Sequence, residues 1–177
     1  MFRVKLLAVL LFVALISNSC GVYSFTGASL SPDIKTISVQ TFYNNSGGGP
    51  PNMGQNFTEK VKGYFQQNTQ LTVTRPQDGI SDLKLEGTIV GYSLSPVAPT
   101  ASTASNPIAT STLTRLTITV QTKFENTRDD SNNFDQSFSF YQDFPSNQSL
   151  QSVEAGLIDI ILDQIVFDIF NKSVANW

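Results

Sequence analysis

The segment RLTITVQTKFEN, residues 115–126, has the clearest strand pattern in the chain and decides the fold class. Apolar and polar side chains alternate along it, which is the period of a β-strand with one buried face and one wet face. The apolar positions are Leu116, Ile118, Val120 and Phe124, and the polar positions are Arg115, Thr117, Thr119, Gln121, Lys123 and Glu125. We therefore expect a half-buried strand from Leu116 to Phe124.

A partner strand follows this segment after the polar turn ENTRDDSNN, residues 125–133. Its apolar side chains share one face, because they are separated by even numbers of residues: Phe134, Phe138, Phe140 and Phe144. The two segments together predict a long antiparallel hairpin that buries one face and exposes the other.

Three further strands are predicted upstream of the hairpin. Residues 35–42 (KTISVQTF) alternate and are rich in β-branched side chains, residues 71–73 form a brief strand, and residues 82–92 (DLKLEGTIVGY) alternate again. The glycines and prolines of residues 44–54 exclude regular structure there. With the hairpin, the chain contains four or five strands.

A short amphipathic helix is predicted between the first two of these strands. Asn56 is the expected N-cap, with Glu59 three residues later as in a capping box. One apolar stripe follows at helical spacing, made of Phe57, Val61, Tyr64 and Phe65.

The C-terminal helix, expected over residues 150–172, changes its apolar face near residue 162. Its first half has one apolar stripe, and the later apolar residues fall on the other side of the helix: Leu162, Val166, Ile169 and Phe170. One interpretation is that the two halves pack on different parts of the same domain. The other is that the second face docks on a partner, because an exposed apolar patch usually has a cover.

Residues 95–112 (SPVAPTASTASNPIATST) are low in complexity and poor in large apolar side chains. Such a segment buries too little apolar surface to offset its ordering entropy, so we expect a mobile loop. A loop of this length is either functional, for example as a lid, or simply tolerated.

Residues 1–19 have the features of a secretory signal peptide, with two early positive charges, the apolar run 6–16 and small polar residues after it. The run is shorter than the roughly 20 residues of a membrane-spanning helix. Cys20, which follows directly, is the only cysteine, and its setting resembles a bacterial lipoprotein signal. We expect Cys20 to carry a lipid anchor; secretion with a free thiol is the alternative. Residues 20–177 are long enough for a single α+β domain.

The composition argues against catalysis and nucleic-acid binding. The chain has no histidine, which removes the usual general base, and its formal net charge is −3. Nucleic-acid binding needs a basic face. One cysteine without histidine makes a poor metal site, so neither a metal nor another cofactor is expected. The sequence therefore predicts a non-enzymatic domain whose function is contact with other molecules.

Four stretches together resemble the Bacteroidetes branch of the LptE family, the outer-membrane lipoproteins of lipopolysaccharide assembly. They are CGVYSFTGASLSPDIKTISVQTFYN, FTEKVKGYF, RLTITVQTKFEN and IFNKSVANW. The resemblance implies a two-layer sandwich, in which two helices pack on a mostly antiparallel sheet of four or five strands. It also implies that Cys20 is the lipid-attachment residue.

The same resemblance implies a location and partners. The protein would be anchored to the cell outer membrane, facing the periplasm or lying within the lumen of the β-barrel LptD. There it would plug and stabilise the barrel and assist lipopolysaccharide transport to the outer leaflet. The alternative is a stand-alone envelope lipoprotein that binds a glycan or lipid.

The wet face of the central strand offers one candidate contact site for lipopolysaccharide. Arg115 and Lys123 lie on it among threonines. Cations in such a setting bind phosphorylated sugars through charge-assisted hydrogen bonds. A solvated or partner-facing sheet surface is the alternative.

Overall fold

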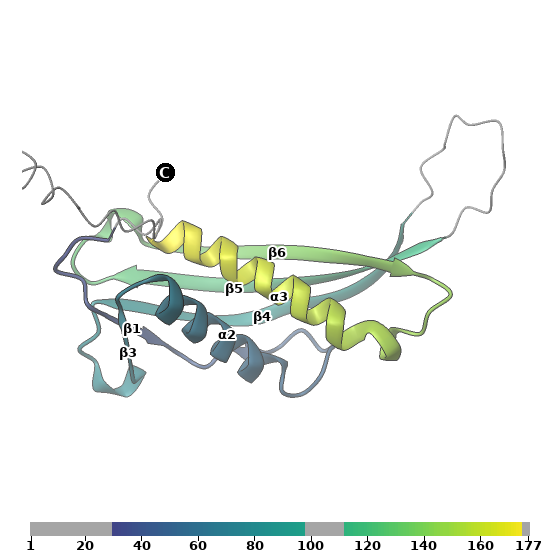
Figure 1. Cartoon of the computed structure of the whole chain (residues 1–177), viewed down its shortest axis with the longest axis horizontal. Coiled ribbons are helices and arrows are strands. Elements are labelled where there is room, and N and C mark those ends of the chain that lie inside the picture. The colour runs from purple at the N-terminus through teal and green to yellow at the C-terminus, as the bar shows by residue number, and fades with distance from the viewer. Residues whose placement is uncertain (1–29, 98–111, 175–177) are drawn as a thin grey trace, which may run out of the picture.

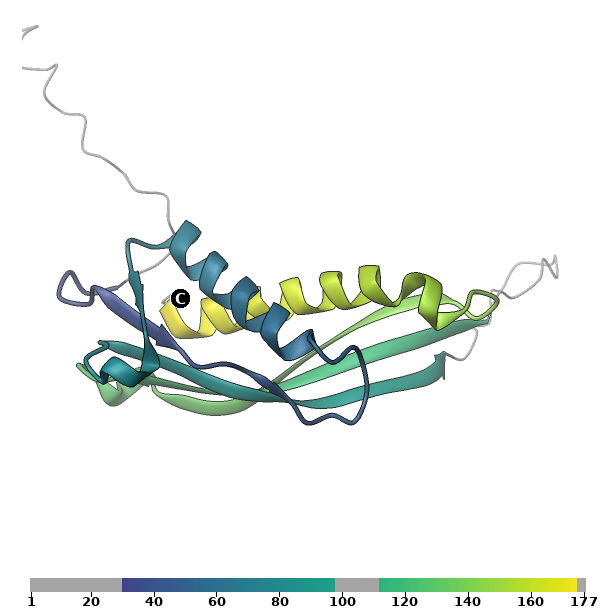
Figure 2. The same ribbon diagram turned by 90° about the horizontal axis from the view of Figure 1, so that it is seen from below.

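The computed structural model describes residues 30–97 and 112–174. In this part of the chain, two helices cover one face of a six-stranded sheet, which confirms the two-layer α+β fold (Figures 1 and 2). The elements are β1 (Thr36–Val39), β2 (Tyr43–Asn44), α2 (Met53–Asn68), β3 (Thr72–Thr74), η1 (Pro76–Asp78), β4 (Leu83–Val97), β5 (Leu113–Asn126), η2 (Asp130–Asn132), β6 (Phe134–Pro145) and α3 (Leu150–Val174).

The strand order is β3-β1-β4-β5-β6, with β2 also beside β4. The strands β4, β5 and β6 form an antiparallel meander, whereas β1 runs parallel to both β3 and β4. A bulge at Val90 shifts the pairing from Ile89–Val120 to Gly91–Thr119. The sheet is therefore mixed but mostly antiparallel, as predicted.

The core lies between the helices and the sheet face that they cover, which we call the inner face. Leu116, Ile118 and Val120 of β5 are fully buried there, which confirms the predicted alternation of this strand. Gly87 of β4 also faces the core, and a Cβ atom at this position would lie 2.2 Å from the Gln121 carbonyl oxygen and 2.5 Å from the Phe42 ring. The missing side chain leaves the space that the Phe42 ring occupies.

The strand predicted over residues 35–42 ends at Val39 as β1, and the separate two-residue strand β2 follows it, so the sheet has six strands where four or five were predicted. The chain leaves the sheet between them, and the Phe42 N–H donates to the Thr58 hydroxyl of α2 at 2.9 Å. The Phe42 side chain turns into the core, where its ring meets that of Phe57 edge to face. The interruption thus joins the sheet layer to α2.

The predicted N-cap of α2 is wrong. The helix begins at Met53 after the N-cap Asn52, and Asn56 lies inside it, donating its N–H to the Asn52 carbonyl at 2.9 Å. Because α2 begins at Met53, Gly54 packs against the segment between β1 and β2. A Cβ atom at Gly54 would lie 2.3 Å from the Phe42 carbonyl oxygen. Packing against the sheet, rather than the capping box, sets where the helix begins.

The second apolar face of α3 is buried within the domain, so its assignment to a partner is wrong. Leu162, Val166, Ile169 and Phe170 belong to the core. The reason is that α2 lies beside the C-terminal half of α3, and the Phe170 ring meets those of Tyr64 and Phe65 at 5.0 and 5.1 Å. The two halves of α3 pack on different parts of one domain.

The predicted loop 95–112 is shorter than expected at its start. Residues 95–97 belong to β4 and pair with residues 113–115 of β5. Residues 98–111 lie outside the described part of the chain, as do the predicted signal peptide 1–19 and Cys20.

Candidate interaction surfaces

The face of the meander opposite the helices, which we call the outer face, is covered by polar side chains. Hydroxyl and amide groups bond across the strands. The Thr119 and Ser139 hydroxyls lie 3.0 Å apart, and the Gln121 amide donates to Asp135 at 2.6 Å and accepts from the Ser137 hydroxyl. These groups present a hydrogen-bonding surface.

Arg115 lies on this outer face, as predicted, but its charge is already paired. Its Nε and Nη2 atoms donate to the two carboxylate oxygens of Asp143 at 2.7 and 2.9 Å. These hydrogen bonds raise the pKa of Arg115 and lower that of Asp143. The guanidinium also lies 3.6 Å from the centre of the Tyr141 ring, a cation–π geometry.

Lys123 also lies on the outer face and is paired with a carboxylate. Its Nζ is 3.3 Å from Glu86 Oε1, and the neighbouring Lys84 Nζ is 3.6 Å from Glu125 Oε1. Each cation of this region therefore has an acidic partner on an adjacent strand. A further carboxylate, Asp135, is hydrogen-bonded to the neutral Gln121 amide, so the outer face has a small excess of negative charge, and a phosphate would have to compete with these carboxylates.

The structure does not bring Arg115 and Lys123 into one site. They are eight residues apart on a single strand, which corresponds to about 27 Å. Their role as lipopolysaccharide contacts stays a prediction. If it holds, each would act in a separate place on the outer face.

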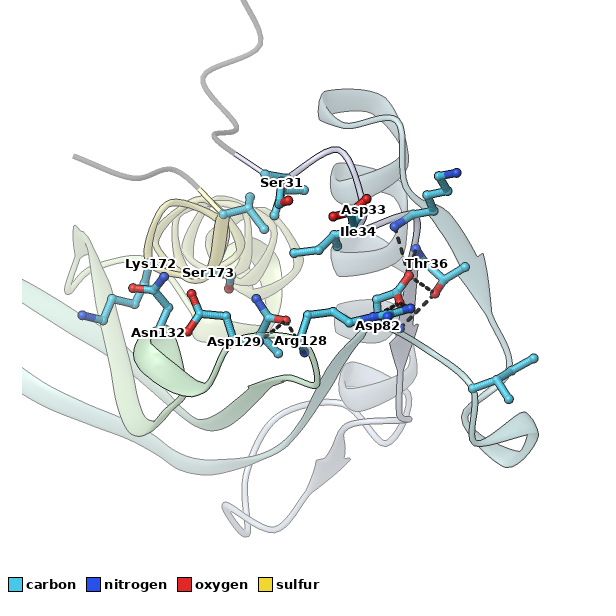
Figure 3. Close-up of a pocket in the computed structure, with 15 residues that line it drawn as sticks. Ser31, Asp33, Ile34, Thr36, Asp82, Arg128, Asp129, Asn132, Lys172 and Ser173 are labelled. Carbon is cyan, nitrogen blue, oxygen red and sulfur yellow. Dashed lines mark hydrogen bonds and ion pairs between the residues drawn. The ribbon is translucent and has the colours of Figure 1, made fainter.

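A pocket of about 910 Å³ lies at the end of the domain where β1 begins and α3 ends (Figure 3). Its wall carries charged side chains of both signs: Asp33, Lys35, Asp82, Arg128, Asp129 and Lys172. The pocket lies at the opposite end of the meander from Val97 and Leu113, where β4 ends and β5 begins and where the loop predicted over residues 95–112 is located (Figure 1). The described ends of this loop therefore do not cover the pocket.

Asp82 is the best-connected carboxylate of this pocket. Its Oδ2 accepts the Lys35 and Thr36 backbone N–H groups at 3.0 and 3.1 Å and the Thr36 hydroxyl at 2.8 Å. Its Oδ1 lies 3.0 and 2.9 Å from Nε and Nη2 of Arg128. The Lys35 N–H makes the largest contribution to lowering the pKa of Asp82 to about 2, against the effect of burial.

The Asp82 cluster has a structural role that the sequence did not reveal. The carboxylate joins the start of β1 to the turn between β5 and β6, and both partners are 46 or 47 residues away along the chain. A lone acidic residue before an alternating strand is a weak signal. Only the fold shows that this residue holds three segments together.

The described residues contain no helix with both the length and the hydropathy to cross a membrane. Within 30–97 and 112–174, His, Cys, Asp and Glu side chains also do not gather in threes as a metal site would require.

Solved structures with a similar fold come from several bacteria, all at low sequence identity. A hypothetical protein from Chlamydia trachomatis has a TM-score of 0.50 at 11% identity, over 81% of this chain and 99% of that chain. A minor lipoprotein from Acinetobacter baumannii has a TM-score of 0.47 at 12% identity, covering 78% and 91%. The lipoprotein GNA1162 from Neisseria meningitidis has a TM-score of 0.41 at 15% identity, covering 77% and 99%.

No curated protein matches the sequence closely enough to supply a function. The family model described as LptE, lipopolysaccharide-assembly, matches residues 34–173, which include every described strand of the sheet, α2, and α3 except its last residue. The match covers most of the chain and agrees with the resemblance of its sequence motifs. The chain therefore belongs to the LptE family of lipopolysaccharide assembly.

Proposed function

We propose that this protein is a non-catalytic outer-membrane lipoprotein that plugs and stabilises an LptD-like β-barrel. Cys20 carries its lipid anchor, and the domain lies within the barrel lumen or at its periplasmic side. In this position it assists the transport of lipopolysaccharide to the outer leaflet. Family membership supports the role in lipopolysaccharide assembly. The barrel partner and the lipid anchor go beyond this role and are proposed here.

The observation that carries the proposal is the polar, largely ion-paired and hydrogen-bonded outer face. Its cations Arg115 and Lys123 are paired with carboxylates on neighbouring strands. The interior of a large outer-membrane barrel is polar. A surface of hydroxyls, amides and ion-paired cations, whose remaining carboxylate Asp135 accepts from Gln121, enters such a lumen without leaving a charge unsatisfied away from water.

The anchor restricts how far the domain can lie from the membrane. Nine residues lie between Cys20 and Leu30, where the described structure begins, and the ten steps from one to the other span at most about 35 Å when fully extended. The pocket end of the domain, where Leu30 lies, is therefore the end nearest the anchor along the chain.

Affinity purification of the full-length, lipidated protein from solubilised outer membrane tests the proposal. Mass spectrometry should identify a stoichiometric LptD-like barrel, and depletion of the protein should reduce both folded barrel and surface lipopolysaccharide. A Cys20→Ser variant is the matched control, since it lacks the proposed anchor and should be released from the membrane. A barrel that folds and works normally in depleted cells would contradict the proposal.

A second candidate is direct binding of a glycan or lipid by a stand-alone lipoprotein, which the 910 Å³ pocket favours. Lys172 on its wall offers a cation to a phosphorylated sugar. Purified lipopolysaccharide should then bind saturably to the soluble domain, and Lys172→Ala should weaken this binding. Lys62→Ala, on α2 and outside this pocket, is the control. Equal binding by both variants would exclude the pocket, and deletion of residues 98–110 separately tests the predicted lid.

A further inference from the structure

The strand β6 forms one edge of the sheet along its whole length. Its 12 residues pair with β5 on one side, and Figure 1 shows it along the upper border of the meander, with no described strand beyond it. The opposite border of the sheet is formed in turn by β3, which has three residues, by β2, which has two, and by residues 90–97 of β4, which include the bulge at Val90, Gly91 and Pro96. Short edges resist the addition of another strand, whereas a long edge exposes a row of backbone donors and acceptors.

The pairing of β6 determines which backbone groups face outward. Ser146 N–H donates to the Thr112 carbonyl at 2.9 Å, and the register continues without a break from Leu113–Pro145 to Phe124–Phe134. Alternate residues of an antiparallel pair exchange these hydrogen bonds, so the even-numbered residues 134–144 bond to β5. The odd-numbered residues 135–145 then direct their N–H and C=O groups to the open edge. Pro145, which has no N–H, occupies one of these outward positions.

The central part of this edge lacks the features by which proteins prevent strand addition. Such features are charged side chains, especially lysine, and prolines and bulges. Residues 136–142 (QSFSFYQ) contain no charge, proline or glycine, and their register with β5 has no bulge. Asp135, Asp143 and Pro145 lie only at the two ends. The uncharged centre offers outward N–H groups from Ser137, Ser139 and Tyr141.

Side chains beside the edge would add contact area for an incoming strand. Tyr141 lies on the outer face and is 46% exposed, and Phe140 lies on the inner face and is partly buried. An added strand would cover aromatic surface on both faces of the sheet. Backbone hydrogen bonds would supply affinity, and these flanking side chains would supply specificity, as in other cases of strand addition.

We infer that the open edge of β6 is a strand-addition site for an extended segment of the barrel partner. The identity of the partner rests on the function proposed above. A second copy of this chain fits less well, because antiparallel self-pairing centred on Ser139 places Asp135 of one copy opposite Asp143 of the other. The incoming segment should therefore carry no acidic side chain opposite these two residues.

Hydrogen exchange at single-residue resolution tests this inference on the lipidated protein, alone and in complex with the captured barrel. The outward amides of Ser137, Ser139 and Tyr141 should exchange at least about tenfold more slowly in the complex. The amides of Phe138 and Phe140 already bond to β5, so they should be protected in both samples and act as internal controls.

Two variants at the centre of the edge separate the backbone donor from the side chain. Ser139→Pro removes the outward N–H, and proline is tolerated on an edge strand at such a position. It should reduce recovery of the barrel at least about tenfold. Ser139→Ala loses the same hydroxyl but keeps the N–H, so it should recover the barrel as the unmodified protein does. Thermal unfolding checks that both variants fold. If Ser139→Pro does not fold, the hydrogen-exchange measurement on the unmodified protein tests the strand-addition site.

The outcomes distinguish this inference from the proposed function. If the barrel is captured but exchange at residues 137, 139 and 141 is unchanged, the strand-addition site is wrong and the proposed function stands. If no barrel is captured, the proposed function and the named occupant are both wrong. If protection increases with protein concentration in the absence of the barrel, the edge binds a second copy, which overturns the choice of occupant.

Discussion

The two faces of the β4–β6 meander differ in the contacts that they make: the inner face buries apolar side chains, and the outer face carries hydrogen-bonded polar ones. On β5, Ile118 is fully buried against the helices, whereas the adjacent Thr119 lies on the outer face and contacts the Ser139 hydroxyl. The inner face stabilises the fold by burying apolar area. The outer face is held by exposed ion pairs and hydrogen bonds, which we expect to contribute little to stability. Its sequence can therefore be matched to a partner at little cost to folding.

Truncation of one side chain on each face of the meander tests this difference most directly. Ile118→Ala should lower the free energy of unfolding by about 2–5 kcal/mol, because it removes buried methyl groups and leaves a cavity. Thr117→Ala, one residue away on the outer face, should change it by less than about 0.5 kcal/mol. Urea unfolding of both variants measures the difference. Similar values for the two would contradict the assignment of stability to the inner face.

Asp82→Asn should have the next largest effect, a loss of about 1–3 kcal/mol in the free energy of unfolding. Asparagine keeps one accepting oxygen, which can serve either the N–H groups of Lys35 and Thr36 or Arg128 but not both, and its NH2 group then faces the remaining donors without a negative charge. Chemical denaturation at neutral pH measures this loss. Asp78→Asn, on the exposed turn η1, is a control that should stay close to the unmodified protein.

The same carboxylate predicts a pH dependence. Folding lowers the pKa of Asp82 from 3.8 to about 2, so the folded state binds fewer protons than the unfolded state in this range. Its stabilisation is complete above pH of about 4 and is lost as the pH falls through about 2. The corresponding slope in unfolding free energy between these values should be smaller in Asp82→Asn. An identical slope would show that other carboxylates account for it.

Thr122 is a polar exception on the inner face and allows a stabilising change. Its side chain is fully buried, and its Oγ1 has no hydrogen-bond partner among the described residues. Thr122→Val replaces the hydroxyl with a methyl group of similar size, so the free energy of unfolding should rise by about 1 kcal/mol. A higher melting temperature would confirm this. A clear loss of stability would show that the hydroxyl has a partner in solution.

The smallest expected change is on the outer face at Lys123. Lys123→Met removes an exposed ion pair with Glu86, which should alter the free energy of unfolding by less than about 0.5 kcal/mol. The stem of methionine keeps much of the same apolar contact. A loss above about 1 kcal/mol would mean that the paired charges of the outer face do contribute to folding.

The meander and the positions of both helices could be predicted from the sequence, because their signals are local. The alternation of β5 and the phenylalanines of β6 show which side chains face the core. The family and its role in lipopolysaccharide assembly could also be predicted, from motifs spread over the chain. Local patterns are informative wherever one face of an element is apolar over its full length.

The features that depend on contacts between distant segments could not be predicted. The start of α2 depends on the fit of Gly54 against the Phe42 carbonyl. The helical wheel of α3 shows two apolar faces, but only the position of α2 beside it explains why Phe170 is buried. The cluster around Asp82 joins segments that are more than forty residues apart. In each case the sequence contains the residue but gives no sign of its partner.

The parallel pairing of β1 determines the order in which the chain is expected to fold. The strands β4, β5 and β6 pair with neighbours along the chain, whereas β1 must pair with β3 and β4 across the whole of α2. Closing such long loops slows folding. We therefore expect the meander and α3 to form first and β1 to dock last. A chain exported with its N-terminus leading would then keep β1 undocked until β4–β6 and α3 have emerged, which leaves its N-terminal region accessible to processing enzymes before the domain closes.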